Sequence, residues 1–372
     1  MRIFSAVFAF LLLCNPVFSF QGKMEEEFSI DVLNVRKGLL SNYVTRVVND
    51  EFNTKYFATE GGITKYDGYD FSEYRPGPNY PGLENENIET LFKGQNNLIW
   101  IGTKGGGLSV LDPGKNTIKS LNSAFAEYSE SALRVIAINQ GTDGKIWVGT
   151  WSDGIFLLDP VTEKVEKHFP FKQPVFNIIR DRFSNIWFLT GIELVKFDPS
   201  EGRLIRFQTG KVHYNLIEDP VRNKIWMIGN EGLKTVLTEF DFETQKIERK
   251  PTNFEARYIL SLGLDKRGRL WIGSWGDGLF ISDENLQNFR RVNTNPQGVS
   301  EENINYSIIL SIDFDENGIA WLGTSHGGVL ILYPNKGFSF ASLATKQNTS
   351  DKNITSLLIS QSGKTYLGTL VE

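Results

Sequence analysis

The feature that most constrains the fold is an aromatic strand that recurs along the chain. Ile99–Thr103 reads IWIGT, Leu270–Ser274 reads LWIGS, and weaker copies such as Trp226–Gly229 lie between them. Successive copies are separated by 44, 47, 40, 39, 45, 50 and 45 residues, and their anchor aromatic residues are Tyr56, Trp100, Trp147, Trp187, Trp226, Trp271, Trp321 and Tyr366. A period near 44 residues is typical of β-propeller blades.

Each repeat also carries the pattern of four short strands. An apolar strand precedes a turn of the Asp-Gly type and the aromatic strand, and glycines such as Gly106-Gly107 lead to a third strand that ends at Asp112-Pro113. A fourth strand, for example Lys164–Phe169, alternates polar and apolar residues as expected at a solvent-facing edge. The pattern predicts an all-β, seven-bladed β-propeller of four-stranded antiparallel blades. A β-solenoid is the main alternative, but its coils usually need fewer residues.

The two ends of the repeat array predict how the ring closes and where it stops. Phe28–Leu33 resembles a fourth strand that stands before the first repeat, and we expect it to complete the last blade and remove the open edge. The propeller would then occupy residues 20–344. Residues 345–372 restart the pattern, with an inner strand at Asn353–Ile359 and an aromatic strand at Tyr366–Thr369. We expect this segment to be the truncated start of a further propeller repeat, an incomplete eighth one.

Residues 1–19 have the features of a secretory signal peptide. Arg2 supplies the positive charge, Ile3–Cys14 is apolar, and Val17-Phe18-Ser19 resembles a cleavage site. Lipoprotein processing at Cys14 is the alternative. Cleavage after Ser19 would remove the only cysteine, so stability would rest on packing, and the protein is predicted to be exported to the bacterial periplasm. No later stretch is apolar for long enough to span a bilayer.

The charge distribution excludes one class of partner. The formal net charge is -5 and no run of Lys and Arg occurs, whereas a nucleic-acid groove needs a basic face to neutralise phosphates. No nucleic-acid partner is therefore expected.

Two segments of the first repeat resemble a known family. Gly38–Val44 (GLLSNYV) precedes Gly61–Phe71 (GGITKYDGYDF), and later repeats combine the IWIGT-type strand with a glycine turn. Together they resemble the two-component regulator propeller repeat along almost the whole chain after the leader. The fourth repeat has a shortened turn at Thr190–Leu194, and the fifth has Pro220 in its hairpin turn. These two repeats are expected to form irregular blades.

The resemblance implies the periplasmic sensor region of hybrid two-component systems from Bacteroidetes, which commonly sense oligosaccharides in signal transduction. The resemblance implies that the ligand is an oligosaccharide or another small molecule. It also implies a second propeller or another copy of the chain as a further partner. Full-length relatives continue through a second propeller, an immunoglobulin-like domain, a membrane helix and a histidine kinase. This chain carries no kinase part, so we expect an incomplete sensor that binds a ligand and is not itself an enzyme.

Motifs for catalysis or metal binding are scarce. The three histidines, His168, His213 and His326, have no His or Cys partner at metal-ligand spacing, and the usual nucleophile, phosphate and dinucleotide motifs do not occur. His168 is predicted on an exposed strand, and His213 on an inner strand in a hydrogen-bonded structural role. Asp313–Gly318 resembles the start of a calcium loop, but a hairpin turn explains it better. No catalytic residue, metal or cofactor is expected.

Candidate ligand-binding residues follow from propeller geometry, because the loops that enter the inner strands and those that join the second and third strands rim one face of a central funnel. Trp151 and Asp153 share one such loop, and Trp275 and Asp277 share another. An indole can pack on the apolar face of a sugar while a carboxylate accepts hydrogen bonds from its hydroxyls. Alternatively, these residues cover neighbouring blades and hold their turns. The candidates on this face are Trp151, Asp153, Trp275, Asp277, Tyr43, Arg134, Tyr258, Glu60, Lys104 and His326.

Two other functions remain open at this stage. A lyase or lactonase-type enzyme would use Glu60 and His326, although few histidines and no clustered carboxylates support it. The second alternative function is that of a protein-interaction scaffold.

Overall fold

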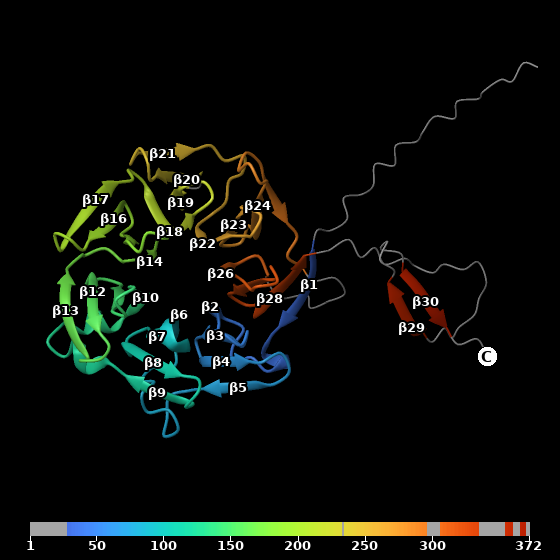
Figure 1. Cartoon of the computed structure of the whole chain (residues 1–372), viewed down its shortest axis with the longest axis horizontal. Helices are drawn as coiled ribbons and strands as arrows, with labels where there is room; N and C mark the ends of the chain where they lie inside the picture. Colours follow the sequence, from blue (N-terminus) through green and yellow to red (C-terminus); the bar gives the residue numbers. More distant parts are fainter. Residues whose placement is uncertain (1–27, 233, 296–305, 335–353, 360–364, 370–372) are drawn as a thin grey trace, which may run out of the picture. The chain divides into compact units, whose positions relative to one another are not determined.

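The computed structural model describes residues 28–232, 234–295, 306–334, 354–359 and 365–369. Within residues 28–334, the described strands form seven antiparallel sheets of four strands each. Figure 1 shows these sheets arranged as blades around a common axis, with β2, β6, β10, β14, β18, β22 and β26 nearest to it. The predicted seven-bladed β-propeller is confirmed.

Blades 1 to 6 follow the chain order, each with its inner strand first. Blade 1 contains β2 (Val44–Asn49), β3 (Lys55–Thr59), β4 (Gly62–Tyr66) and β5 (Phe71–Tyr74). Blades 2 and 3 contain β6 (Ile88–Lys93), β7 (Ile99–Thr103), β8 (Leu108–Asp112) and β9 (Thr117–Ser120), then β10 (Val135–Gln140), β11 (Ile146–Thr150), β12 (Ile155–Asp159) and β13 (Lys164–Phe169). Blade 4 contains β14 (Asn177–Arg180), β15 (Ile186–Leu189), β16 (Glu193–Asp198) and β17 (Arg203–Gln208).

The remaining blades complete the ring. Blade 5 contains β18 (Val212–Asp219), β19 (Lys224–Glu231), β20 (Lys234–Asp241) and β21 (Ile247–Lys250), and blade 6 contains β22 (Ile259–Leu264), β23 (Leu270–Ser274), β24 (Leu279–Ser282) and β25 (Phe289–Val292). Blade 7 contains β26 (Ile309–Phe314), β27 (Ala320–Thr324), β28 (Val329–Pro334) and β1 (Phe28–Leu33). Short 3-10 helices are η1 (Val35–Lys37), η2 (Gln95–Asn97), η3 (Asn122–Phe125) and η4 (Glu130–Leu133).

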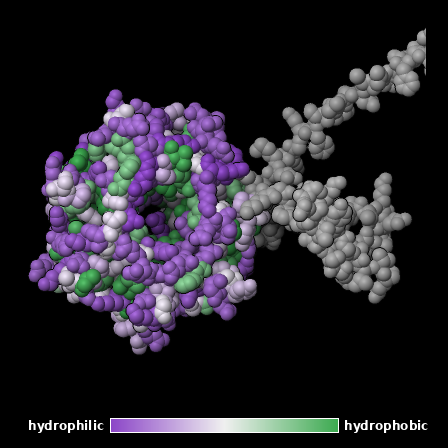
Figure 2. All heavy atoms as spheres, in the orientation of Figure 1, coloured by the Kyte–Doolittle hydropathy of each residue, from purple (hydrophilic) through white to green (hydrophobic). Residues whose placement is uncertain are grey.

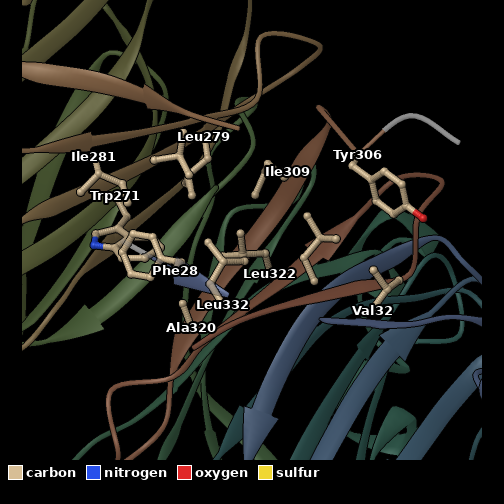
Figure 3. Close-up of a cluster of buried hydrophobic side chains, with 12 residues drawn as sticks. Phe28, Val32, Trp271, Leu279, Ile281, Tyr306, Ile309, Ala320, Leu322 and Leu332 are labelled. Atoms are coloured by element: carbon tan, nitrogen blue, oxygen red, sulfur yellow. The ribbon is translucent and has the colours of Figure 1, made fainter. Parts of the chain in front are cut away.

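Ring closure occurs as the sequence predicted. β1 pairs with β28 in antiparallel register, with Phe28 opposite Pro334 and Leu33 opposite Val329. Phe28 also meets Trp271 of blade 6 edge-on, with ring centroids 5.1 Å apart, as the close-up in Figure 3 shows. The first described strand therefore joins the last blade and also seals the boundary between blades 6 and 7.

The anchor aromatic residues form the core between successive blades. Trp147 packs on Phe197 of blade 4, Trp187 on Phe240 of blade 5, and Trp321 on Phe57 of blade 1. These residues are at most 8% exposed. The blades therefore hold together by burying large aromatic surfaces that no single blade could bury alone.

The hairpin aspartates explain why an acidic residue precedes the aromatic strand in most repeats. In blade 6, Asp265 accepts backbone N–H bonds from Arg267 and Arg269 with Oδ1, and the indole N–H of Trp271 with Oδ2 at 2.9 Å. Blades 4, 5 and 7 repeat the indole bond through the pairs Trp187–Asp181, Trp226–Asp219 and Trp321–Asp315. One carboxylate thus closes the turn and satisfies a buried donor.

The glycine of the aromatic strand permits close contact between blades. A Cβ on Gly323 in blade 7 would lie 2.5 Å from the carbonyl oxygen of Val44 in blade 1. Only glycine leaves room for this approach. The hydroxyl that follows it, as in Thr324, donates to the carbonyl of Gly328 at 2.9 Å and fixes the next turn.

The two repeats expected to be irregular keep the four-strand order. In blade 5, β18, β19 and β20 are eight residues long, whereas β14 of blade 4 has four residues. The departures in sequence therefore change strand length and leave the topology unaltered.

Residues 335–372 form a separate compact unit, of which β29 (Ile354–Ile359) and β30 (Thr365–Thr369) are described. These strands pair in antiparallel register with the same shift after the first residue that ring blades show. The predicted leader, residues 1–19, lies outside the described residues. In the described part of the chain, no helix is long and apolar enough to cross a membrane.

Candidate ligand-binding funnel

A β-bulge at the start of the inner strand recurs around the ring. In six blades the register of the inner strand with its neighbour shifts near the start of the strand, between its first and third residues in five blades, as between Ile259 and Ser261, and between its second and fourth residues in blade 5. A bulge leaves one residue unpaired and redirects its side chain. The bulged residues are Thr45, Glu89, Ile136, Tyr214, Leu260 and Leu310. In blade 4, Phe176 stands just before β14, and its N–H donates to the Leu189 carbonyl at 3.0 Å.

A cavity of about 460 Å³ is lined by Phe176 and by three of the bulged residues, Tyr214, Leu260 and Leu310. Its lining comes from inner strands of blades 1, 5, 6 and 7, from the loop entering blade 4 and from two loops of blade 6, so the cavity lies at the ring axis. Figure 2 shows an opening at the centre of the ring, bordered by both hydrophobic and hydrophilic residues. The volume falls in the range of small-molecule sites. The lining residues are Arg46, Phe176, Tyr214, Asn215, Tyr258, Ile259, Leu260, Trp275 and Leu310.

Aromatic side chains make up much of the cavity wall. Phe176 and Tyr214 meet edge to face, with ring centroids 5.3 Å apart. Tyr258 is 60% exposed and Trp275 is 46% exposed, which is unusual for such large side chains. The wall can therefore offer ring faces to a ligand.

The backbone fixes the two exposed aromatic residues relative to each other. The Trp275 N–H donates to the carbonyl of Tyr258 at 2.9 Å, and Trp275 also forms a β-bridge with Ile308 of blade 7. Tyr258 has a φ of 40°, a left-handed conformation that is rare for a bulky residue. Such strain persists only where surrounding bonds impose it, and it is enriched at functional sites.

Polar groups also line the cavity. The Asn215 side chain accepts a hydrogen bond from Asn177 Nδ2 at 2.8 Å and donates to the Leu260 carbonyl at 3.4 Å. Arg46 is half-buried, and its pKa is lowered by burial, an effect that the nearby Asp313 charge opposes. The cavity thus combines apolar ring faces with hydrogen-bonding groups, as sites for small polar ligands do.

Of the ten residues proposed from the sequence, Trp275 and Tyr258 line the cavity. Trp151 is 41% exposed, but the Arg134 guanidinium lies over its ring. Arg134 in turn donates to Glu89 of blade 2 through both Nε and Nη2, at 3.2 and 3.1 Å. Lys104 is exposed, and its backbone forms an isolated β-bridge with that of Arg134. These residues form a second polar and aromatic cluster over blades 2 and 3.

The two loop aspartates bond to neighbouring loops. Asp153 Oδ2 accepts from the Ser129 hydroxyl at 3.0 Å, and Asp277 Oδ2 accepts from the Arg257 N–H at 2.8 Å. Each carboxylate therefore ties its loop to the segment that enters an inner strand. These bonds favour the turn-holding interpretation for the aspartates.

The other candidates lie outside the cavity lining. Tyr43 is half-buried, and its pKa is raised by burial and then by the charges of Glu89 and Glu60. Glu60 is exposed and accepts a bond from the Ser41 hydroxyl at 3.3 Å. His326 is exposed. The enzymatic alternative based on Glu60 and His326 therefore gains no support from the cavity at the ring axis, which neither residue lines.

The remaining histidines have structural surroundings. His213 is fully buried, with Nδ1 2.9 Å from the Lys211 carbonyl and Nε2 2.9 Å from the Thr238 hydroxyl, so its predicted structural role is confirmed. His168 lies on β13, the outer strand of blade 3, in agreement with the predicted exposed, alternating strand, and its side chain is half-buried. Its ring stacks on Phe156 with centroids 4.2 Å apart, because β13 pairs with β12 and places the two residues opposite each other.

Sequence reasoning missed most of the cavity lining. Phe176 belongs to an expected type of loop but was not among the candidates, whereas six missed residues belong to inner strands and not to the loops that were expected to rim the funnel: Arg46, Tyr214, Asn215, Ile259, Leu260 and Leu310. A signal did exist. Phe176, Leu260 and Leu310 each stand 11 residues before the anchor aromatic of their repeat, and Tyr214 stands 12 before its own.

Comparisons with known proteins give structural relatives only. No family model matches the chain, and no curated protein matches it significantly. The extracellular domain of a putative hybrid two-component system from B. thetaiotaomicron matches with a TM-score of 0.68 and 21% identity, over 92% of this chain and 47% of that one. A second such extracellular domain from B. thetaiotaomicron matches with a TM-score of 0.66, again at 21% identity, over 92% of this chain and 44% of that one.

The chain therefore spans about half the length of these solved domains. A streptogramin B lyase also matches, with a TM-score of 0.62 and 13% identity, over 83% of this chain and 98% of the lyase. At these identities the likeness shows the propeller fold.

Proposed function

We propose that this propeller is a ligand-binding part of an exported two-component sensor, and that it binds an oligosaccharide at the axis of the ring. The observation that carries the proposal is the cavity of about 460 Å³ lined by Phe176, Tyr214, Tyr258 and Trp275 together with Arg46 and Asn215. Rings that stack on pyranose faces and groups that bond to hydroxyls are the two requirements of a sugar site.

The sensor assignment draws on the structural relatives. Two of them are named as extracellular domains of putative two-component systems, and this chain spans about half of each. The repeat resemblance points to the same class of protein. Export to the periplasm, a partner propeller and transmission of a signal belong to this proposal.

A glycan panel tests the ligand class. The purified protein is screened by thermal shift with neutral and acidic oligosaccharides, and each hit is titrated by isothermal calorimetry. We expect at least one oligosaccharide to raise the melting temperature and bind with a stoichiometry of one, because a ligand that binds only the native state stabilises it. If no glycan in the panel binds at millimolar concentration, the oligosaccharide assignment is wrong.

A further inference from the structure

One residue of the cavity breaks the pattern of the repeat. Arg46 is the third residue of the inner strand β2, and the residue after it, Val47, pairs with Phe57 of the aromatic strand. Phe57 directly follows the anchor aromatic residue of its repeat. In every other blade, the equivalent of Arg46 is therefore the residue before the one that pairs with the residue after the anchor. These six residues are uncharged: Thr90, Ala137, Asn177, Asn215, Ser261 and Ser311. The fold itself therefore does not require a charge at this position.

The equivalent residues in several blades link neighbouring inner strands. Asn177 donates to the Leu216 carbonyl at 3.3 Å, Asn215 to Leu260 at 3.4 Å, and Ser261 to Ile309 at 3.1 Å. Arg46 makes no such link: among the described residues, its guanidinium has no hydrogen bond and no ion pair. It is the one charged side chain among the described residues that line the cavity.

The acidic residue that acts on Arg46 electrostatically forms a hydrogen bond with another side chain. Asp313 of β26 influences Arg46 electrostatically, but its Oδ2 accepts a hydrogen bond from Asn49 at 3.1 Å and the two charged groups form no ion pair among the described residues. A structural ion pair does occur close by, where buried Lys55 lies 3.8 Å from Asp315. Lys55 and Asp315 thus form a buried structural ion pair, whereas Arg46 forms no ion pair among the described residues.

A guanidinium that faces a partly apolar cavity without a hydrogen-bonded partner is costly, because burial removes water and only the charge of Asp313 compensates for it. A guanidinium offers a planar set of donors that matches a carboxylate or sulfate group in two parallel hydrogen bonds. Resting on the proposed function, we propose that Arg46 binds an anionic group of the ligand, so that the ligand is an acidic oligosaccharide. The anion is a uronate carboxylate or a sulfate ester, both of which present the required oxygens.

The rings around the cavity fit this assignment. Trp275 and Tyr258 are the exposed aromatic residues of the lining, whereas Arg46 belongs to the inner strand β2. A sugar stacked on the aromatic residues would direct its anionic substituent toward the guanidinium. The acidic group would thus select among sugars that stack equally well.

Isothermal calorimetry on the full chain tests this inference with size-matched neutral, uronate-containing and sulfated oligosaccharides. We expect an acidic ligand to bind at least about tenfold more tightly than its neutral counterpart. In R46Q this preference should disappear, whereas R46K should keep part of it because the charge remains. R75Q is the matched control, since Arg75 in the same blade is exposed and pairs with Glu73, and its ligand preference should equal that of the wild type.

Circular dichroism and melting temperature establish that each variant is folded, and R46K tests the site if R46Q is not. Neutral and acidic ligands that bind equally to the wild type would overturn the role of Arg46 and leave the proposed function standing. An acidic preference that survives in folded R46Q would also overturn it. If no oligosaccharide of any class binds, the proposed function itself fails. A preference for uronate over sulfate, or the reverse, identifies the source of the anion.

Discussion

The guanidinium carbon of Arg134 lies 3.9 Å from the centre of the Trp151 ring. Bonds from Nε and Nη2 to Glu89 hold the guanidinium there, so one face of the indole is covered. Trp275 occupies the corresponding loop of blade 6, but among the described residues no ring or cation lies on it. Two loops that look alike in sequence therefore leave different surfaces available to a ligand.

This difference predicts unequal effects of two alanine substitutions. W275A should weaken binding of an oligosaccharide by roughly 1 kcal/mol or more, since it removes a stacking surface of the cavity. W151A should change the affinity little, because Trp151 is outside the cavity lining. Calorimetric titration of both variants measures this. A larger loss in W151A than in W275A would move the binding site to blades 2 and 3.

The acidic-ligand inference predicts a pH dependence. Burial raises the pKa of Asp313 to about 6, with the charges of Arg46 and Lys55 opposing the shift and Asp315 adding to it. Above this pH the ionised Asp313 offsets the positive charge of Arg46, and below it the offset is lost. The affinity for an anionic ligand should therefore rise on going from pH 7.5 to pH 5.5, by a factor on the order of five.

D313N is the control for this prediction, because it removes the titrating group and keeps the shape. Its affinity for the anionic ligand should be high at both pH values. An equal rise with falling pH in D313N would assign the effect to another group.

His213 predicts a loss of stability in acid. Burial lowers its pKa to about 4, although the hydrogen bond to Lys211 acts in the opposite direction. An unfolded histidine titrates near 6.5, so between these values the unfolded chain binds the proton first and the free energy of unfolding falls as pH falls. The loss should approach about 3 kcal/mol at pH 4.

Urea unfolding at several pH values measures this slope. The comparison is made in the D313N background, because Asp313 contributes a pH dependence of the opposite sign. Its raised pKa makes the protein less stable as pH rises from 3.8 to about 6. H213Q should flatten the remaining slope. An unchanged slope in H213Q would assign the acid sensitivity to other residues.

The hairpin aspartates predict a large loss of stability in one variant and a small one in its control. D265A removes the acceptor of the Trp271 indole and of two turn N–H groups, and should cost on the order of 3 kcal/mol. D143A removes an exposed carboxylate that accepts one bond, from Lys145, and should cost less than about 1 kcal/mol. Urea midpoints compare them. Equal midpoints would show that the indole bond adds little.

The fold could be predicted from sequence because the sequence motifs that specify each blade are local and repeated. The Trp strand, the Asp turn and the glycine turn recur with a period near 44 residues, and β1 was visible as an unpaired strand before the first repeat. The site was harder to predict. Trp151 is covered because Arg134 lies over its ring and Glu89 of the adjacent blade holds Arg134 there, which the sequence of the Trp151 loop does not reveal. A bulge such as the one at Leu310 is likewise a property of strand pairing.

The most direct test of the central claim is to fill the cavity. Leu310, the bulged residue of blade 7, lines it, whereas Ile136, the bulged residue of blade 3, does not. L310W and I136W place the same bulky ring at equivalent positions, and calorimetry compares their affinity for the best oligosaccharide. We predict that L310W, with its fold intact by circular dichroism, loses at least about tenfold in affinity while I136W binds like the wild type. Wild-type affinity in folded L310W would contradict a binding site at the axis of the ring.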